Sequence, residues 1–155
     1  MKLDSSTHVD TAMLIRRPAG EAYEAFIDPA ITTKFWFTES TGRLEKGKEV
    51  EWTWRMYNAT GVILVKDLVP DRKIGIEWGP KGAARSRAEW TFEAVDAQSV
   101  FVTVAVDGFA GDEMTVFNNI IGSVTGSCWV LAAAKAWLEH GIQLNLIGDR
   151  FPKGK

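Results

Sequence analysis

The stretch GSVTGSCWVLAAAKAWLEHG, residues 122–141, decides the fold of this chain. It predicts one long helix, because small and apolar residues recur in it at steps of three and four. The stripe that they form consists of Val124, Ser127, Cys128, Leu131, Ala134 and Leu138. We expect this stripe to face a sheet, and we expect Gly141 to end the helix. A stripe of such small side chains can interlock with large ones or leave a hollow beside them.

The residues just before this stretch leave two alternatives open. The apolar residues Met114, Val116, Phe117, Ile120 and Ile121 could begin the long helix or form a separate short one. We expect Asp112 to be the N-cap in this region.

Upstream of the helix, apolar and polar residues alternate as they do in half-buried strands. Residues 49–57 show this best, with Val50, Trp52, Trp54 and Met56 on one face and Glu49, Glu51, Thr53 and Arg55 on the other. The predicted strands are residues 9–15, 49–57, 62–68, 73–78, 87–95 and 99–106, with a loop at 79–82. Two short helices, beginning at Pro18 and Pro29, lie between the first two strands.

Consecutive strands joined by short turns, followed by one long helix, predict an α+β fold with an antiparallel sheet covered by that helix. A length of 155 residues is that of about one domain, so we expect residues 1–155 to form a single domain.

Composition excludes several classes of function. The net charge is −2 and the basic residues are scattered, so no basic surface is expected to bind nucleic acid or an anionic membrane. The single cysteine, Cys128, fits a reducing compartment. We find neither a signal peptide nor a run of about 18 apolar residues that could span a membrane. We therefore expect a cytoplasmic protein.

Residues for metal binding and catalysis are sparse. His8 and His140 lie near opposite ends of the chain, and no metal-binding motif occurs, so we expect neither a metal nor a cofactor. Cys128 is interpreted as a small buried side chain, not as a nucleophile. The strand carboxylates Glu51, Glu77, Glu89 and Glu93 alternate with apolar neighbours and should face solvent. We therefore assign no catalytic residue, and whether the protein is an enzyme stays open.

Seven tryptophans is a high number for this length, and they could either fill the core or line a pocket. If they line a pocket, the small residues of the helix provide its volume, and Tyr57, Ser127 or an indole N–H orients the ligand. The candidate ligand-binding residues are Trp36, Trp54, Met56, Trp78, Trp90, Ser127, Cys128 and Leu131.

Three stretches resemble a known family. They are Ile15-Arg16-Arg17-Pro18-Ala19 with Glu24-Ala25-Phe26, Pro29 and Lys34-Phe35-Trp36-Phe37; Gly61-Val62 and Val69-Pro70-Asp71-Arg72 with Ile76-Glu77-Trp78; and Leu138-Glu139-His140-Gly141. With them, nearly the whole chain resembles the START-like (SRPBCC) superfamily and, within it, the AHSA1-like group named after the activator of the Hsp90 ATPase.

The resemblance implies the helix-grip fold, in which a curved antiparallel β-sheet wraps around a long C-terminal helix and leaves a cavity between them. Members of the superfamily include lipid and hormone carriers and polyketide aromatase/cyclases. The Hsp90 activator carries an additional chaperone-binding domain for which this chain has no room, so we do not expect Hsp90 activation.

Three functions follow as hypotheses. The leading one is binding of a small hydrophobic or aromatic ligand in the cavity between the sheet and the helix. A cyclase- or hydrolase-like enzyme using the same pocket is the second, and it requires an inward acid–base pair. The third is a non-catalytic interaction or dimerisation module with a filled core. The sequence leaves open whether the protein is a monomer or a homodimer. Ala134→Trp should abolish binding if a pocket lies beside it, and should destabilise the domain if the core there is packed.

Overall fold

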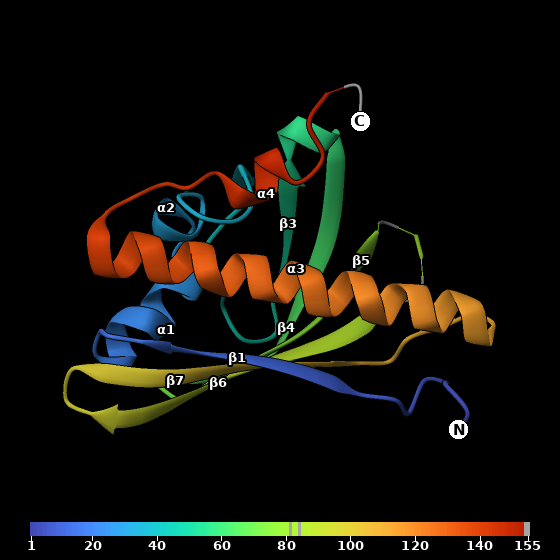
Figure 1. Cartoon of the computed structure of the whole chain (residues 1–155), viewed down its shortest axis with the longest axis horizontal. Helices are drawn as coiled ribbons and strands as arrows, with labels where there is room; N and C mark the ends of the chain where they lie inside the picture. The colour runs from blue at the N-terminus through green and yellow to red at the C-terminus, as the bar shows by residue number, and fades with distance from the viewer. Residues whose placement is uncertain (81, 84, 154–155) are drawn as a thin grey trace.

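The part of the chain that the structure describes forms one seven-stranded antiparallel sheet with a long helix across one face (Figure 1). Our computed structural model describes residues 1–80, 82–83 and 85–153. The strands are β1 (Val9–Ile15), β2 (Glu39–Ser40), β3 (Glu49–Trp54), β4 (Ala59–Val69), β5 (Lys73–Pro80), β6 (Ser86–Asp96) and β7 (Ser99–Asp107), in the order β1-β7-β6-β5-β4-β3-β2. The helices are α1 (Ala19–Ile27), α2 (Pro29–Thr32), α3 (Glu113–His140) and α4 (Leu146–Asp149), with a 3₁₀ turn, η1, at Arg55–Tyr57.

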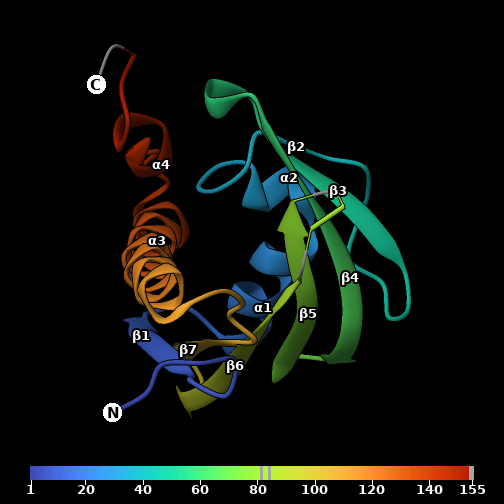
Figure 2. The ribbon, with the colours of Figure 1, turned by 90° about the vertical axis from the view of Figure 1, so that its right-hand side faces the viewer.

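The sheet is curved, and its curvature decides where space is left inside the fold. Figure 2 shows it bending from β1 and β7 beneath α3 round to β3 and β2, with α1 and α2 inside the bend. A bulge interrupts the register of β4 between Val65 and Asp67, and another interrupts β6 between Ala94 and Asp96. Bulges of this kind bend the strand that carries them. The predicted α+β helix-grip fold is confirmed.

The core lies between the concave face of the sheet, the short helices and the second half of α3. Its fully buried members include Ile15, Ile63, Val65, Ile74, Ile76, Val100, Val102, Leu131 and Ala134. In β7, Val100 and Val102 alternate with the exposed Phe101, as the sequence predicted. The central strands β4 and β5 are instead covered on both faces, at half-buried Leu64 and buried Gly75.

Helix α3 is continuous, which decides between the two alternatives for residues 113–121. It begins after Asp112, whose carboxylate accepts a hydrogen bond from the Thr115 amide at 2.8 Å. It ends at Gly141, whose left-handed backbone (φ 64°) suits glycine. Both predicted ends are confirmed.

The predicted inward stripe of α3 is wrong at Cys128, which is exposed and not buried. The buried positions in this part of the helix are Val130, Leu131, Ala133 and Ala134. Small and apolar residues occur all round this helix, so their spacing fits several faces and does not single out one.

Two strand predictions need correction. The strand expected over residues 49–57 ends at Trp54, and Met56 lies in η1 instead of on the inner face. The strand stops there because the Arg55 amide donates to the Thr38 hydroxyl at 2.9 Å. The loop expected over 79–82 begins later, since β5 continues through Pro80, which pairs with Gly61; Lys81 lies outside the described residues.

Helix α3 is long and apolar enough to cross a membrane by length and composition, contrary to the expectation that no such run exists. No charged residue lies between Glu113 and Lys135. In the fold, α3 packs against β1 and contributes Leu131 and Ala134 to the core, so we interpret it as the core helix of the domain. Only 22% of its most apolar window is buried, which leaves apolar side chains on its outer face.

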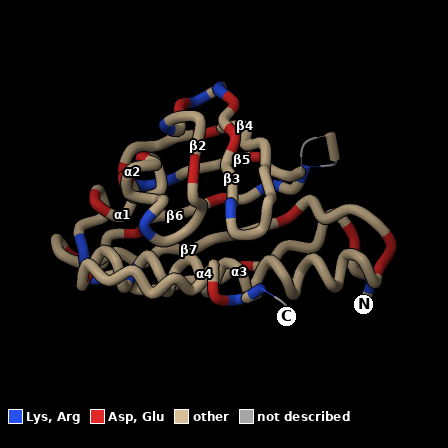
Figure 3. Tube along the Cα trace, turned by 90° about the horizontal axis from the view of Figure 1, so that it is seen from above, with Lys and Arg blue, Asp and Glu red and all other residues tan. Residues whose placement is uncertain are grey.

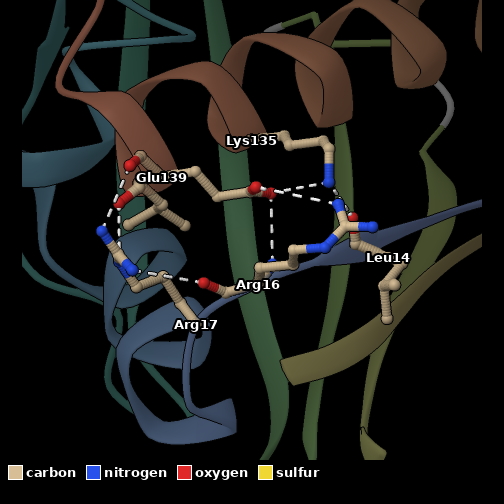
Figure 4. A network of polar contacts seen from close by, with 6 residues as sticks. Leu14, Arg16, Arg17, Lys135 and Glu139 are labelled. Atoms are coloured by element: carbon tan, nitrogen blue, oxygen red, sulfur yellow. Dashed lines mark hydrogen bonds and ion pairs between the residues drawn. The ribbon is translucent and has the colours of Figure 1, made fainter. Parts of the chain in front are cut away.

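Polar contacts join the end of α3 to the end of β1 (Figure 4). The Glu139 carboxylate accepts from the Lys135 ammonium at 2.6 Å and from the Arg16 amide at 3.1 Å. Lys135 also donates to the Leu14 carbonyl at 2.6 Å, and Arg17 donates to two carbonyls of the last turn of α3 at 2.8 and 3.2 Å. Figure 4 shows both arginines, which directly follow β1, reaching towards the end of α3, where cations are favourable.

Replacing Glu139 by glutamine is expected to lower the free energy of unfolding at pH 7 by about 1–3 kcal/mol, because the 8% exposed carboxylate holds charge-assisted hydrogen bonds. Burial alone would raise the pKa of Glu139, but the bonds from Lys135 and Arg16 outweigh it and hold this pKa below its ordinary 4.5. A lowered folded-state pKa means that the stabilisation is present above about pH 4.5 and is lost as the pH falls through the folded value.

Urea unfolding between pH 3 and 7 measures this effect. The Glu139→Gln variant should lose less stability on acidification than the wild type. Glu21→Gln is the matched control, since Glu21 forms an exposed pair with Arg17 and should change stability by less than about 0.5 kcal/mol. Equal effects of the two substitutions would contradict the role assigned to Glu139.

Candidate functional site

A cavity of about 210 Å³ lies between the inner face of the sheet, α3 and the C-terminal segment. It is smaller than the roughly 300–1,000 Å³ of pockets for drug-sized ligands, and larger than the ~150 Å³ cavity known to accept benzene. Its size therefore suits one or two fused rings. The lining residues are Trp36, Trp54, Tyr57, Trp78, Trp90 and Val104; Gly122, Ser123, Gly126, Ser127 and Val130 of α3; and Ile147, Arg150 and Phe151.

Four tryptophans form the wall on the sheet side. Trp54, Trp78 and Trp90 come from β3, β5 and β6, and the alternation of each strand turns its indole inward. Trp36, just after α2, packs edge-on against Trp78 with ring centroids 5.8 Å apart. Its centroid is also 5.8 Å from that of Trp90. These contacts hold the rings rigidly, so the wall is preformed.

The space behind this wall is filled. Phe37 stacks on Trp52 with ring centroids 4.5 Å apart, and Trp36 lies 4.8 Å from Trp52. The void enclosed by Phe26, Trp36, Leu44, Trp52, Ile74 and Trp90 has no room for a water molecule. The sequence left open whether the aromatic residues fill the core or line a pocket. In the structure some of them pack the core and others line the cavity.

The wall on the helix side is formed by residues with little or no side chain. Gly122, Gly126 and Val130 lie four residues apart on α3, with Ser123 and Ser127 beside them. A Cβ added at Gly122 would meet no atom within 4 Å. Space remains because this part of α3 projects almost nothing towards the tryptophans.

Five of the eight candidate residues line the cavity: Trp36, Trp54, Trp78, Trp90 and Ser127. The other three lie elsewhere. Met56 is 38% exposed in η1, Cys128 is exposed on α3, and Leu131 is buried in the core away from the cavity.

The C-terminal segment supplies a third wall that sequence reasoning did not assign. Ile147, Arg150 and Phe151 line the cavity, and the Tyr57 hydroxyl donates a hydrogen bond to the Ile147 carbonyl. The available signal was an apolar group, Leu144, Leu146, Ile147 and Phe151, after the helix had ended. Its position against η1 depends on tertiary contacts and could not be read from spacing.

The polar groups that line the cavity include the hydroxyls of Tyr57, Ser123 and Ser127 and the guanidinium of Arg150. Arg150 is the one charged residue in the lining, which contains no carboxylate, imidazole or thiol among the residues described. The Nε1 atoms of Trp78 and Trp90 have no partner in the described part of the chain, but they are covered by protein atoms, so neither faces the open space of the cavity.

A second hollow, of about 500 Å³, lies on the outer face of the sheet and differs in character. Its charges are paired with one another: Lys73 with Asp67 and Glu89, and Lys66 with Glu77. The hydrogen bond from Lys73 and the charge of that lysine lower the pKa of Asp67, which keeps the pair ionised. This groove is the solvated face of the sheet, where Glu77 and Glu89 were expected.

Within residues 1–80, 82–83 and 85–153, no group of three or more histidine, cysteine or acidic side chains is arranged to hold a metal ion.

Known proteins resemble this chain in family and in fold. The family model described as Activator of Hsp90 ATPase homolog 1-like protein matches residues 16–123. The match ends within α3, so the second half of that helix and the C-terminal segment lie outside it. None of the curated proteins matches the chain.

Many solved structures share the fold, including the following three. The protein SSP2350 from Staphylococcus saprophyticus is 27% identical, with 89% of this chain and 96% of that one covered and a TM-score of 0.74. DynU16, from the dynemicin biosynthetic locus, is 17% identical, with 90% of this chain and 49% of its own covered and a TM-score of 0.77. The Aha1 dimer from Colwellia psychrerythraea is 15% identical, with 87% and 98% covered and a TM-score of 0.75. The last two are likenesses of fold alone.

Proposed function

This chain belongs to the Activator of Hsp90 ATPase homolog 1-like family, and we propose that it binds one small, largely apolar molecule in the cavity between the sheet and α3. The observation that carries the proposal is an unfilled space with four tryptophans on one side and glycine and serine on the other. A core selected only for stability would fill such a space, because an apolar cavity costs free energy. The lining provides shape and hydrogen-bond donors, which suit binding.

Apolar burial sets the expected affinity. A ring system the size of an indole buries about 200 Å², which at roughly 25 cal/mol per Å² gives about 5 kcal/mol. One or two hydrogen bonds to polar groups of the lining, such as the hydroxyls of Ser123 and Ser127, add to this, and lost ligand freedom subtracts from it. We therefore expect dissociation constants between about 1 μM and 1 mM for probes of this size.

Native mass spectrometry of freshly purified protein, followed by denaturation, tests for a bound molecule directly. Calorimetric titration with the neutral probe naphthalene-2-carboxamide then tests the site. The wild type should bind one molecule per chain. Ser127→Trp should abolish binding, because the indole would occupy the cavity.

Cys128→Trp is the matched control, since it adds the same side chain one residue away on the exposed side of α3. It should bind the probe like the wild type. If the wild type neither releases a molecule nor binds the probe, or if both variants lose binding equally, the proposal is wrong.

Self-association is a second candidate function, favoured by the outer face of α3. Met114, Phe117, Ile121 and Trp129 are exposed on this helix, and Figure 3 shows no charge along its middle. The same face of a second copy of the chain could cover it, because contact between two uncharged faces needs no charge complementarity. The Aha1 protein of Colwellia psychrerythraea, which has a similar fold, is a dimer. The same native mass spectrum tests self-association. A particle of two chains at micromolar protein concentration supports self-association, and a monomer alone contradicts it.

Residues 1–155 are proposed to form one domain, supported by the single sheet and the single hydrophobic core of the described residues. The proposed compartment is the cytoplasm, because the single cysteine, Cys128, fits a reducing environment. Limited proteolysis should leave one resistant fragment of nearly full length, and cell fractionation should place the protein in the soluble cytoplasmic fraction. The expectation that Hsp90 is not a partner stays a prediction, which a pull-down with purified Hsp90 tests.

A further inference from the structure

We infer that the ligand carries a carboxylate, which Arg150 binds at the C-terminal wall of the cavity, while the apolar body of the ligand lies against the tryptophans. This inference rests on the proposed function and specifies the class of molecule bound. It starts from the residues that follow α3, which the family match does not reach.

The C-terminal segment holds Arg150 against the cavity. The Tyr57 hydroxyl bonds the Ile147 carbonyl, and the Asn145 amide donates to the Asp149 carboxylate at 2.9 Å. The Arg150 guanidinium lies over the Phe151 ring, 4.9 Å from its centroid. Its Nη1 lies 3.6 Å from the point that a Cβ on Gly126 would occupy, so the guanidinium reaches α3 where the helix has no side chain.

No acidic side chain neutralises Arg150 within the described residues. None lies within ion-pair distance of its guanidinium, and the neighbouring Asp149 carboxylate is held by Asn145. Every other residue of the lining is uncharged. A half-buried cation beside apolar surface, with its planar donor fork unused, suits a carboxylate, which can accept two parallel hydrogen bonds.

The chemistry of the guanidinium sets the kind of group that the ligand must carry. A guanidinium can only donate hydrogen bonds, so the ligand must supply the acceptors. A purely hydrocarbon ligand would supply none. A planar acid with a carboxylate at its edge supplies two acceptor oxygens and a charge opposite to that of Arg150.

A matched pair of probes tests the inference: naphthalene-2-carboxylate and its neutral isostere naphthalene-2-carboxamide, titrated calorimetrically at pH 7. The wild type should bind the carboxylate at least about tenfold more tightly, because only the carboxylate carries the opposite charge and can accept two parallel hydrogen bonds from the guanidinium. Arg150→Gln should bring the two affinities within about twofold and leave that for the carboxamide nearly unchanged. Arg150→Lys should retain part of the preference, since it keeps the charge and loses the planar fork.

Lys153→Gln is the control for general electrostatics, because it removes one exposed positive charge from the same segment. It should keep the preference for the carboxylate. Equal affinity of the wild type for both probes, or a preference that survives Arg150→Gln, overturns the inference and leaves the proposed function standing. Failure of the wild type to bind either probe overturns the inference, and it overturns the proposed function as well if no molecule is released on denaturation.

Discussion

Truncating Trp36 to alanine is expected to lower the free energy of unfolding by about 3–5 kcal/mol, the largest loss we expect from removal of a side chain. The Trp36 ring pairs with those of Phe26, Phe37, Trp52, Trp54, Trp78 and Trp90. It stands between the filled core and the cavity, so its removal joins the cavity to a new void. The neighbouring rings are held on several strands and cannot all collapse into that void.

Urea unfolding followed by far-UV circular dichroism measures this loss without relying on tryptophan fluorescence. Trp129→Ala is the control, because Trp129 is 41% exposed on the outer face of α3, and its removal should cost less than about 1 kcal/mol. Similar losses in the two variants would show that Trp36 is not the centre of the cluster. Added indole should partly restore the stability of the Trp36→Ala variant, because a ligand that binds only the folded state stabilises it.

The strands could be predicted from the sequence because strongly apolar side chains alternate with charged or polar ones at adjacent positions. In β3, Val50 and Trp52 are buried while Glu49 is exposed, and a shift of one residue would reverse every side chain. Strand β2 could not be predicted, since its two residues carry no period, and they pair with β3 only through the tertiary fold. The end of β3 was misplaced because apparent alternation continued through Met56, where the hydrogen bond from the Arg55 amide to Thr38 turns the chain.

The cavity wall could be predicted where it depends on strand period and not where it depends on helix rotation. Trp54, Trp78 and Trp90 were identified because their strands allow only two directions. Cys128 was misplaced because α3 has small or apolar residues on every side, so sequence spacing fits more than one rotation about its axis. Sequence spacing could not identify Arg150, because this residue lies beyond the end of α3. Its position at the cavity depends on the path that the chain takes after Gly141.

The rotation of α3 also decides the outcome of Ala134→Trp, which the sequence left open. Ala134 is 0% exposed and does not line the cavity, so the core beside it is packed. The indole of a tryptophan at position 134 has no space to occupy. In a densely packed interior, such extra volume strains side chains and displaces the backbone. We expect this variant to lose about 3 kcal/mol or more of unfolding free energy.

Ser127→Trp provides the matched comparison, because it places the same side chain two turns earlier on α3, beside the cavity. That variant should retain most of its stability and lose its ligand, whereas Ala134→Trp should lose about 3 kcal/mol or more of its unfolding free energy. Thermal unfolding of both variants, with probe titration of any that fold, measures the difference. If Ala134→Trp kept wild-type stability and lost ligand binding, the cavity would have to extend along α3 beyond Val130, and the packing assigned to this part of the helix would be wrong.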